Sequence, residues 1–120
     1  MGDYLSMLKR FFVITIFIIV IILLSIWLST IAKCEYLTYR YGAQFENAYV
    51  GHTMFETPDY HKILEYSETR AVVYYVSWFG CGNTVVFERQ DAQSSWEFVS
   101  WNTDWSTGGS ADGFVWPYIR

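Results

Sequence analysis

An uninterrupted apolar segment near the N-terminus constrains this 120-residue chain more than any other feature. Residues 11–32 contain no charged side chain, and most of them are Ile, Leu, Val or Phe. As an α-helix the segment would be about 33 Å long, which exceeds the roughly 30 Å of a bilayer's hydrocarbon core. Its Ser and Thr hydroxyls can bond to the helix's own carbonyls, and Trp27 stands near an end, where an indole suits the interface. We therefore predict a transmembrane helix over residues 11–32, in contact with lipid.

Two processing fates are compatible with this segment. A retained signal anchor suits its length, because the apolar core of a cleaved signal peptide spans only about 7–15 residues. Cleavage is the alternative, since Thr30 and Ala32 are small residues at the positions that would precede a cleavage site. We expect the anchor to be retained.

Basic residues do not decide the orientation, because Lys9 and Arg10 precede the segment and two more basic residues follow it closely. A ten-residue N-terminus is easily left in the cytoplasm, and paired cysteines are most useful in an oxidising compartment. We expect residues 1–10 in the cytoplasm and residues 33–120 in the periplasm or extracellular space. The protein would then be a single-pass protein of the inner (cell) membrane.

The 88 residues after the apolar segment are aromatic and acidic. They include 9 Tyr, 6 Phe and 5 Trp, and each such ring can bury on the order of 150–250 Å² in the core of a small domain. They carry 11 Asp and Glu against 6 Lys and Arg. Nucleic acids and anionic headgroups are bound through clustered Lys and Arg. We therefore expect no nucleic-acid partner and a protein partner that is basic.

Cys34 and Cys81 are the two cysteines of the chain, and they predict a disulfide between the membrane-proximal segment and the tip of a hairpin. Closing a loop of about 48 residues would contribute about 4 kcal/mol in the chain-entropy model. Two free thiols are the alternative.

Periodicity and turn residues predict an α+β fold. The transmembrane helix is followed by a three- to four-stranded antiparallel β-meander and one short helix. That helix is expected over residues 57–67, where a Thr-Pro-Asp start precedes apolar residues spaced three and four apart. Strands are expected at residues 36–41, 71–79, 83–89, 96–101 and 114–119.

Two further features follow from the strand predictions. Residues 71–79 form the central strand, and residues 80–83 make the hairpin turn that follows it. In the strand at residues 96–101, alternation places Trp96 and Phe98 on one face and Val99 and Trp101 on the other.

Two weak metal patterns occur. His61 and Glu65 would share a face of the predicted helix, and residues 102–106 alternate oxygen-bearing side chains in the manner of a calcium loop. The first lacks further ligands, and the second has Gly113 where a bidentate Glu belongs. We expect no metal, no cofactor and no catalytic residues.

Aromatic and acidic side chains gather near the C-terminus, and one short helix cannot bury both faces of a sheet. A core made of most of these rings is the alternative to an exposed surface. The candidate binding residues are Trp101, Asp104, Trp105, Asp112, Trp116 and Tyr118.

These features favour a protein-binding domain over an enzyme. A small, acidic, tethered domain suits an inhibitor or immunity protein that captures a toxin or wall-degrading enzyme. An accessory subunit packed through its helix is the alternative, although the span lacks Gly and has few small residues. A pilin-like subunit is disfavoured, because the span has no Glu near its start.

Overall fold

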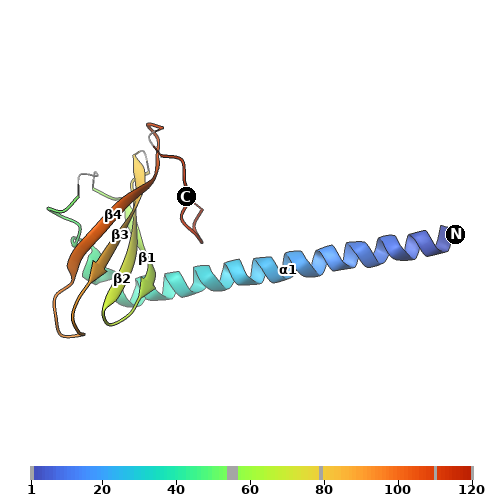
Figure 1. Cartoon of the computed structure of the whole chain (residues 1–120), viewed down its shortest axis with the longest axis horizontal. Helices are drawn as coiled ribbons and strands as arrows, with labels where there is room; N and C mark the ends of the chain where they lie inside the picture. The colour runs from blue at the N-terminus through green and yellow to red at the C-terminus, as the bar shows by residue number, and fades with distance from the viewer. Residues whose placement is uncertain (1, 54–56, 79, 110, 120) are drawn as a thin grey trace.

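The computed structural model describes residues 2–53, 57–78, 80–109 and 111–119. A long helix, α1 (Gly2–Tyr41), carries a four-stranded antiparallel sheet at its C-terminal end, and the rest of the helix extends away from the sheet (Figure 1). The predicted α+β class, an apolar N-terminal helix followed by a small sheet domain, is confirmed.

Helix α1 runs without interruption through the apolar segment and into the domain. It is long and apolar enough to cross a membrane, with a mean hydropathy of 3.2 over an 18-residue stretch. The hydroxyls of Thr15, Ser25 and Thr30 each donate to the carbonyl four residues earlier, as hydroxyls in an apolar helix are expected to do. The helix is therefore consistent with single-pass anchoring.

The strand predicted at residues 36–41 is wrong, because α1 continues through it. Leu37 and Tyr41, four residues apart, both pack against the core of the sheet domain. Cys34 and Thr38, also four apart, bond to the nearest strand. Residues four apart lie on one face of a helix, and this face packs against the sheet. The local alternation of aromatic and polar residues does not reveal this helical spacing.

The sheet is a meander in the order β1-β2-β3-β4. Its strands are β1 (Tyr60–Tyr66), β2 (Arg70–Val76), β3 (Cys81–Glu88) and β4 (Glu97–Ser106). The predicted hairpin is confirmed, with β2 and β3 as the central strands. The turn is displaced, because β3 already begins at Cys81 and the N–H of Gly80 donates to the carbonyl of Ser77. Phe79, where the central strand was predicted to end, lies outside the described residues.

The helix predicted at residues 57–67 is wrong, since β1 occupies this segment. Asp59 does not lie in the first turn of a helix. Its carboxylate accepts a hydrogen bond from the backbone N–H of Trp78 (2.7 Å), and its own N–H donates to the carbonyl of Val76 (2.8 Å). His61 contacts the ring of Tyr75 from β1, so His61 and Glu65 do not share a helix face. Pairing with β2 overrides the local helix signal.

Two register shifts against β3 change which face the β4 side chains occupy. Val99 has no register partner in β3, so Phe98 and Trp101 lie on the same face, although simple alternation places them on opposite faces. Asp104 is a second such residue, so Trp105 lies on the opposite face from Trp101. The alternation of apolar and polar residues in the sequence does not indicate where such bulges occur.

The two faces of the sheet have different covers. The end of α1 and the 3-10 helix η1 (Gly42–Phe45) cover one face, whose core includes Phe45, Ile63, Val73, Tyr75, Val85 and Phe87. The C-terminal segment, defined here as residues 111–119, covers the other face, with a core of Tyr74, Val76, Trp105 and Val115.

The edge strand predicted at residues 114–119 is wrong, because the C-terminal segment makes a turn. The backbone N–H groups of Tyr118 and Ile119 both donate to the carbonyl of Val115. Pro117 follows a cis peptide bond.

Candidate functional site

The β1 edge of the sheet is closed by α1. The backbone N–H of Ile63 donates to the hydroxyl of Thr38 (2.8 Å), and the thiol of Cys34 donates to the carbonyl of Leu64 (3.8 Å). Two helix side chains thus supply partners that a neighbouring strand would otherwise supply. An edge covered in this way is not a template for another chain.

The β4 edge is open over most of its length. Within the part of the chain that the structure describes, residues 97–103 pair with β3 alone. The end of the strand is partly covered, because Trp105 forms a bridge with Asp112 and the N–H of Ser106 donates to the C-terminal segment. Alternate residues of such an edge point N–H and C=O groups away from the sheet, where another strand can pair with them.

The open edge carries apolar side chains next to polar ones. Val99 is 49% exposed and Trp101 is 37% exposed. Ser100 and Asn102, their neighbours, are exposed too. Phe98 instead turns toward the core and stacks on the ring of His52. Residues 99–102 therefore offer a short exposed strand with one indole.

A pair of carboxylates lies at one end of this edge. Glu88 and Glu97 are register partners across β3 and β4, and both are exposed. Arg70 is the register partner of Glu88 on β2, but its guanidinium pairs with Glu65 (2.8 Å). Among the described residues neither Glu88 nor Glu97 forms an ion pair. Like charges placed opposite each other are destabilising, so a cation bound here would relieve the repulsion.

The structure separates the six predicted binding residues. Trp101 lies on the open edge, whereas Trp105 is 8% exposed and its indole N–H donates to the hydroxyl of Tyr74. Sequence reasoning missed Gly82 as the reason for this placement. A Cβ at Gly82 would collide with the Trp105 ring. A glycine within a strand pattern is the signal that could have revealed the close approach.

Asp104 and Asp112 lie near the end of β4. The carboxylate of Asp104 accepts hydrogen bonds from the hydroxyl of Thr84 and from the side-chain amide of Asn102. Asp112 is exposed and forms the bridge with Trp105. Asp104 thus fastens the bulge in β4, whereas Asp112 is the more exposed of the two residues.

Trp116 and Tyr118 lie on the other side of the domain, against α1. The hydroxyl of Tyr118 donates to Glu35 (2.9 Å), and Trp116 is close to Trp27 on the surface of the helix. These two residues therefore do not belong to the β4 edge.

The predicted disulfide between Cys34 and Cys81 does not form, and both cysteines are free. Cys34 is buried against β1, whereas Cys81 begins β3, two strands away, where its sulfur accepts a hydrogen bond from Asn83. Neighbouring strands are about 4.8 Å apart, so a separation of two strands exceeds the reach of a disulfide. Burial raises the pKa of the Cys34 thiol, which makes it a poor nucleophile.

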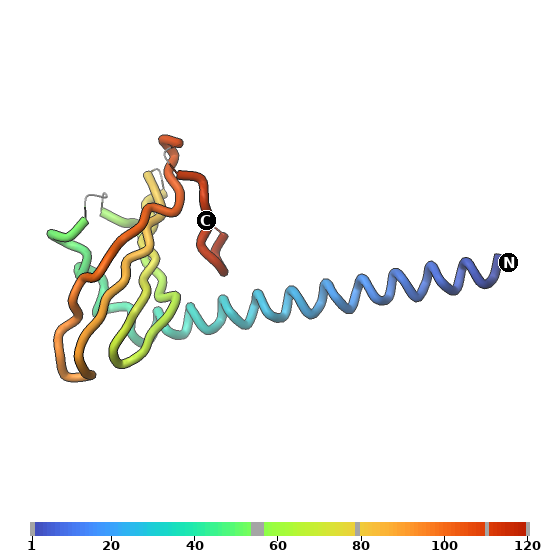
Figure 2. Tube along the Cα trace, in the orientation of Figure 1, coloured from blue at the N-terminus to red at the C-terminus, as the bar shows by residue number. Residues whose placement is uncertain are grey.

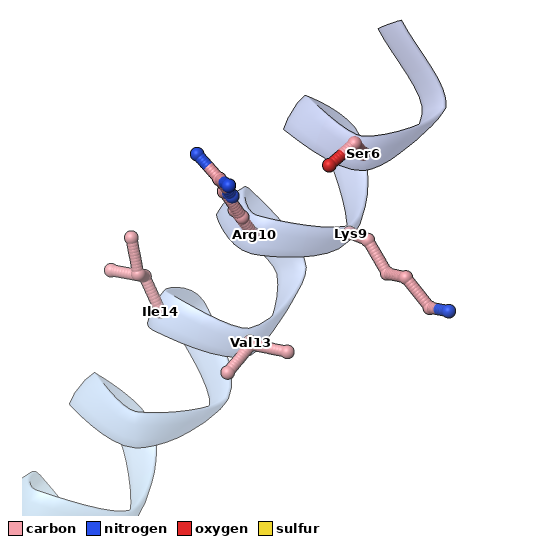
Figure 3. Close-up of a pocket in the computed structure, with 5 residues that line it drawn as sticks. All are labelled: Ser6, Lys9, Arg10, Val13 and Ile14. Carbon is pink, nitrogen blue, oxygen red and sulfur yellow. The ribbon is translucent and has the colours of Figure 1, made fainter. Parts of the chain in front are cut away.

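The described residues contain no cluster of three or more His, Cys, Asp and Glu side chains arranged to hold a metal ion. The ring of His61 contacts the carbonyl of Gly42 (2.7 Å). A shallow hollow on α1 involves Ser6, Lys9, Arg10, Val13 and Ile14, and Figure 3 shows Lys9 and Arg10 pointing away from each other. These two cations do not converge on a ligand.

Comparison with known proteins gives no assignment. No family model, no curated protein and no solved structure matches this chain.

Proposed function

We propose that this protein is a membrane-anchored binding domain that captures a basic protein along the β4 edge. Its domain faces the periplasm or extracellular space, and it acts as an inhibitor or immunity protein against a toxin or wall-degrading enzyme. The contrast between the two edges carries the proposal, because α1 closes β1 while residues 97–103 of β4 pair, within the described part of the chain, with β3 alone.

An extended segment of the partner would add a strand to β4. Backbone hydrogen bonds would supply affinity, and the exposed side chains of Val99 and Trp101 would supply specificity. Trp is among the residues that dominate binding energy when an interface desolvates it. The bulges at Val99 and Asp104 restrict pairing to the short regular run between them.

Charge supports a basic partner. Glu88 and Glu97 stand beside the exposed run without a cation of their own among the described residues. The whole chain has a net charge of −4. A basic partner would be steered toward this edge, and the rate of association would fall as salt rises.

The anchor supports capture near a membrane. Figure 2 shows the β3–β4 hairpin farther from the N-terminus of α1 than the β1–β2 hairpin, so the open edge lies on the side away from the span. A tethered domain raises the local concentration of its binding surface without any new contact. The placement of the domain outside the cytoplasm stays a prediction, because the disulfide argument for it no longer applies.

The test is a pull-down with the full-length tagged chain from detergent-solubilised membranes of the source cells. Trp101→Ala should reduce retention of a soluble basic protein by about tenfold or more, as expected for an interface hot spot. Glu97→Lys should also reduce retention, and the reduction should be larger at low salt than at high salt. Trp78→Ala is the matched control, because Trp78 is exposed but lies in the β2–β3 connection. The captured enzyme should also lose activity when the full-length protein is added.

Two results would contradict the proposal. Equal retention by Trp101→Ala, Glu97→Lys and the Trp78→Ala control would exclude β4 as the binding edge. Capture of integral membrane proteins alone, unchanged by these substitutions, would favour the accessory-subunit alternative.

A further inference from the structure

The C-terminal segment lies against α1 within the level of the apolar span. The indole N–H of Trp27 donates to the carbonyl of Pro117 (2.8 Å). Around this contact a shallow apolar hollow is lined by Val20, Leu23, Leu24, Trp27, Trp116 and Ile119. The last two residues of this set come from the C-terminal segment, more than 85 positions away in the chain.

The depth of this contact follows from helix geometry. Leu24 lies eight residues before Ala32, the end of the apolar run, and so about 12 Å from that end along the helix axis. A hydrocarbon core is about 30 Å thick. When residues 11–32 span this core, Trp116 and Ile119 lie inside it, on the N-terminal side of the level at which the apolar run ends.

The backbone of the turn is suited to such a position. Irregular backbone is costly in hydrocarbon unless its polar groups are paired. The N–H groups of Tyr118 and Ile119 donate to the carbonyl of Val115 (2.7 and 2.9 Å), and the carbonyl of Pro117 accepts from Trp27. Pro117 itself has no N–H to satisfy.

The side chains of the segment are sorted by polarity along α1. Trp116 is 49% exposed and Ile119 is 54% exposed, at the level of Leu24. Tyr118 points its hydroxyl to Glu35, which also pairs with Lys62 (2.9 Å), beyond the end of the apolar run. The apolar side chains of Trp116 and Ile119 thus lie at the depth of the lipid tails, and the hydroxyl of Tyr118 lies near the membrane surface.

We propose that residues 114–119 insert into the leaflet on the domain side and form a second membrane contact beside α1. Lipid acyl chains cover Trp116 and Ile119, because the surface that these residues form is continuous with the exposed apolar surface of α1. Two contacts fix the tilt of the domain on the membrane and hold β4 away from it. This inference does not depend on the partner proposed for β4.

The test uses the full-length chain labelled with 5-fluorotryptophan in nanodiscs of phosphatidylcholine and phosphatidylglycerol. Trp116→Phe and Trp78→Phe identify the two ¹⁹F resonances, and both substitutions keep an aromatic ring. Doxyl-labelled lipid should abolish the Trp116 signal and leave the Trp78 signal. A water-soluble gadolinium chelate should do the reverse.

Trp78 is the matched control because it is exposed in the β2–β3 connection, outside the C-terminal segment. Loss of the Trp116 signal to gadolinium, with no effect of doxyl lipid, would overturn the proposal and place the segment in water. Protection of Trp116 from both agents would also overturn it, because protein, such as a second copy of this chain, would then cover the hollow.

Discussion

Each edge of the sheet is a strand with one neighbour. The two edges differ in what covers their outward-pointing backbone N–H and C=O groups. At β1, Thr38 and Cys34 of α1 bond to the backbone of Ile63 and Leu64. At β4, the described chain supplies no such cover to residues 97–103, and the strand has two bulges instead. Bulges and charges discourage pairing between like edges but leave a complementary strand free to bind. The closed side is therefore part of the packed fold, whereas the open side is the surface that we propose for recognition.

The largest expected effect lies in the core on the closed side. Phe45 is fully buried between η1 and the sheet, with its ring 5.2 Å from that of Phe87 and 5.3 Å from that of Trp96. Phe45→Ala should lower the free energy of unfolding by about 3–5 kcal/mol. Denaturant unfolding of the full-length protein in detergent micelles, followed by Trp fluorescence, measures it. Val50→Ala, at an exposed position, should change the free energy by less than about 0.5 kcal/mol. Similar losses for both variants would show that the core is not here.

The closure of the β1 edge can be tested with a nearly isosteric change. Thr38→Val removes the hydroxyl that accepts from the N–H of Ile63. An N–H left without a partner in a partly buried position should cost about 1–2 kcal/mol. Ser100→Ala removes a hydroxyl from the open edge and should cost less than about 0.5 kcal/mol. Equal losses of unfolding free energy for the two variants in the same assay would show that the hydroxyl of Thr38 does not stabilise the β1 edge.

A salt bridge ties the closed edge to α1 and adds a pH dependence. Desolvation alone would raise the pKa of Glu35, but hydrogen bonds from Lys62 and Tyr118 and the charge of Lys62 lower it below its ordinary value. The stabilisation is therefore complete above the unfolded pKa of about 4.3 and is lost as pH falls through the lower folded pKa. Because Glu35 is exposed and Lys62 is only partly buried, Glu35→Gln should cost only about 0.5 kcal/mol at pH 7.

The measurement compares thermal unfolding of Glu35→Gln and the natural chain at several pH values. The difference between the two should shrink toward zero as pH falls below the folded pKa of Glu35. A difference that stays constant from neutral to acidic pH would mean that the carboxylate charge does not contribute.

The sequence allowed the helix and the central hairpin to be predicted, and it named one candidate residue, Trp101, that the structure places on the open edge. Strong local signals were responsible: a long uncharged apolar run, β-branched strands around a glycine-containing turn, and an indole in a short strand. Trp101 was accordingly included among the candidates and lies on the open edge. Its partner and the role of the edge in binding stay predictions.

The remaining features depend on contacts between distant residues. A Thr-Pro-Asp start predicts a helix, but pairing of β1 with β2 and the hydrogen bond from Trp78 to Asp59 outweigh it. The bulges at Val99 and Asp104 shift the alternation without any local mark. The open edge itself is a property of the whole sheet, because it exists only where no other segment of the described chain packs.

The smallest expected effect is a gain in stability at the open edge. Glu97 faces Glu88 in the register of β3 and β4, and two carboxylates in such positions repel each other. Glu97→Gln should therefore raise the free energy of unfolding by about 0.3 kcal/mol at low salt, and the gain should shrink in 1 M salt. Glu46→Gln removes an exposed carboxylate that lies outside the sheet and should leave stability unchanged. Unfolding at two salt concentrations measures both variants. A gain for Glu97→Gln, together with weaker capture of the basic partner, would show that this edge gives up stability for binding, whereas a loss of stability would mean that the carboxylate serves the fold.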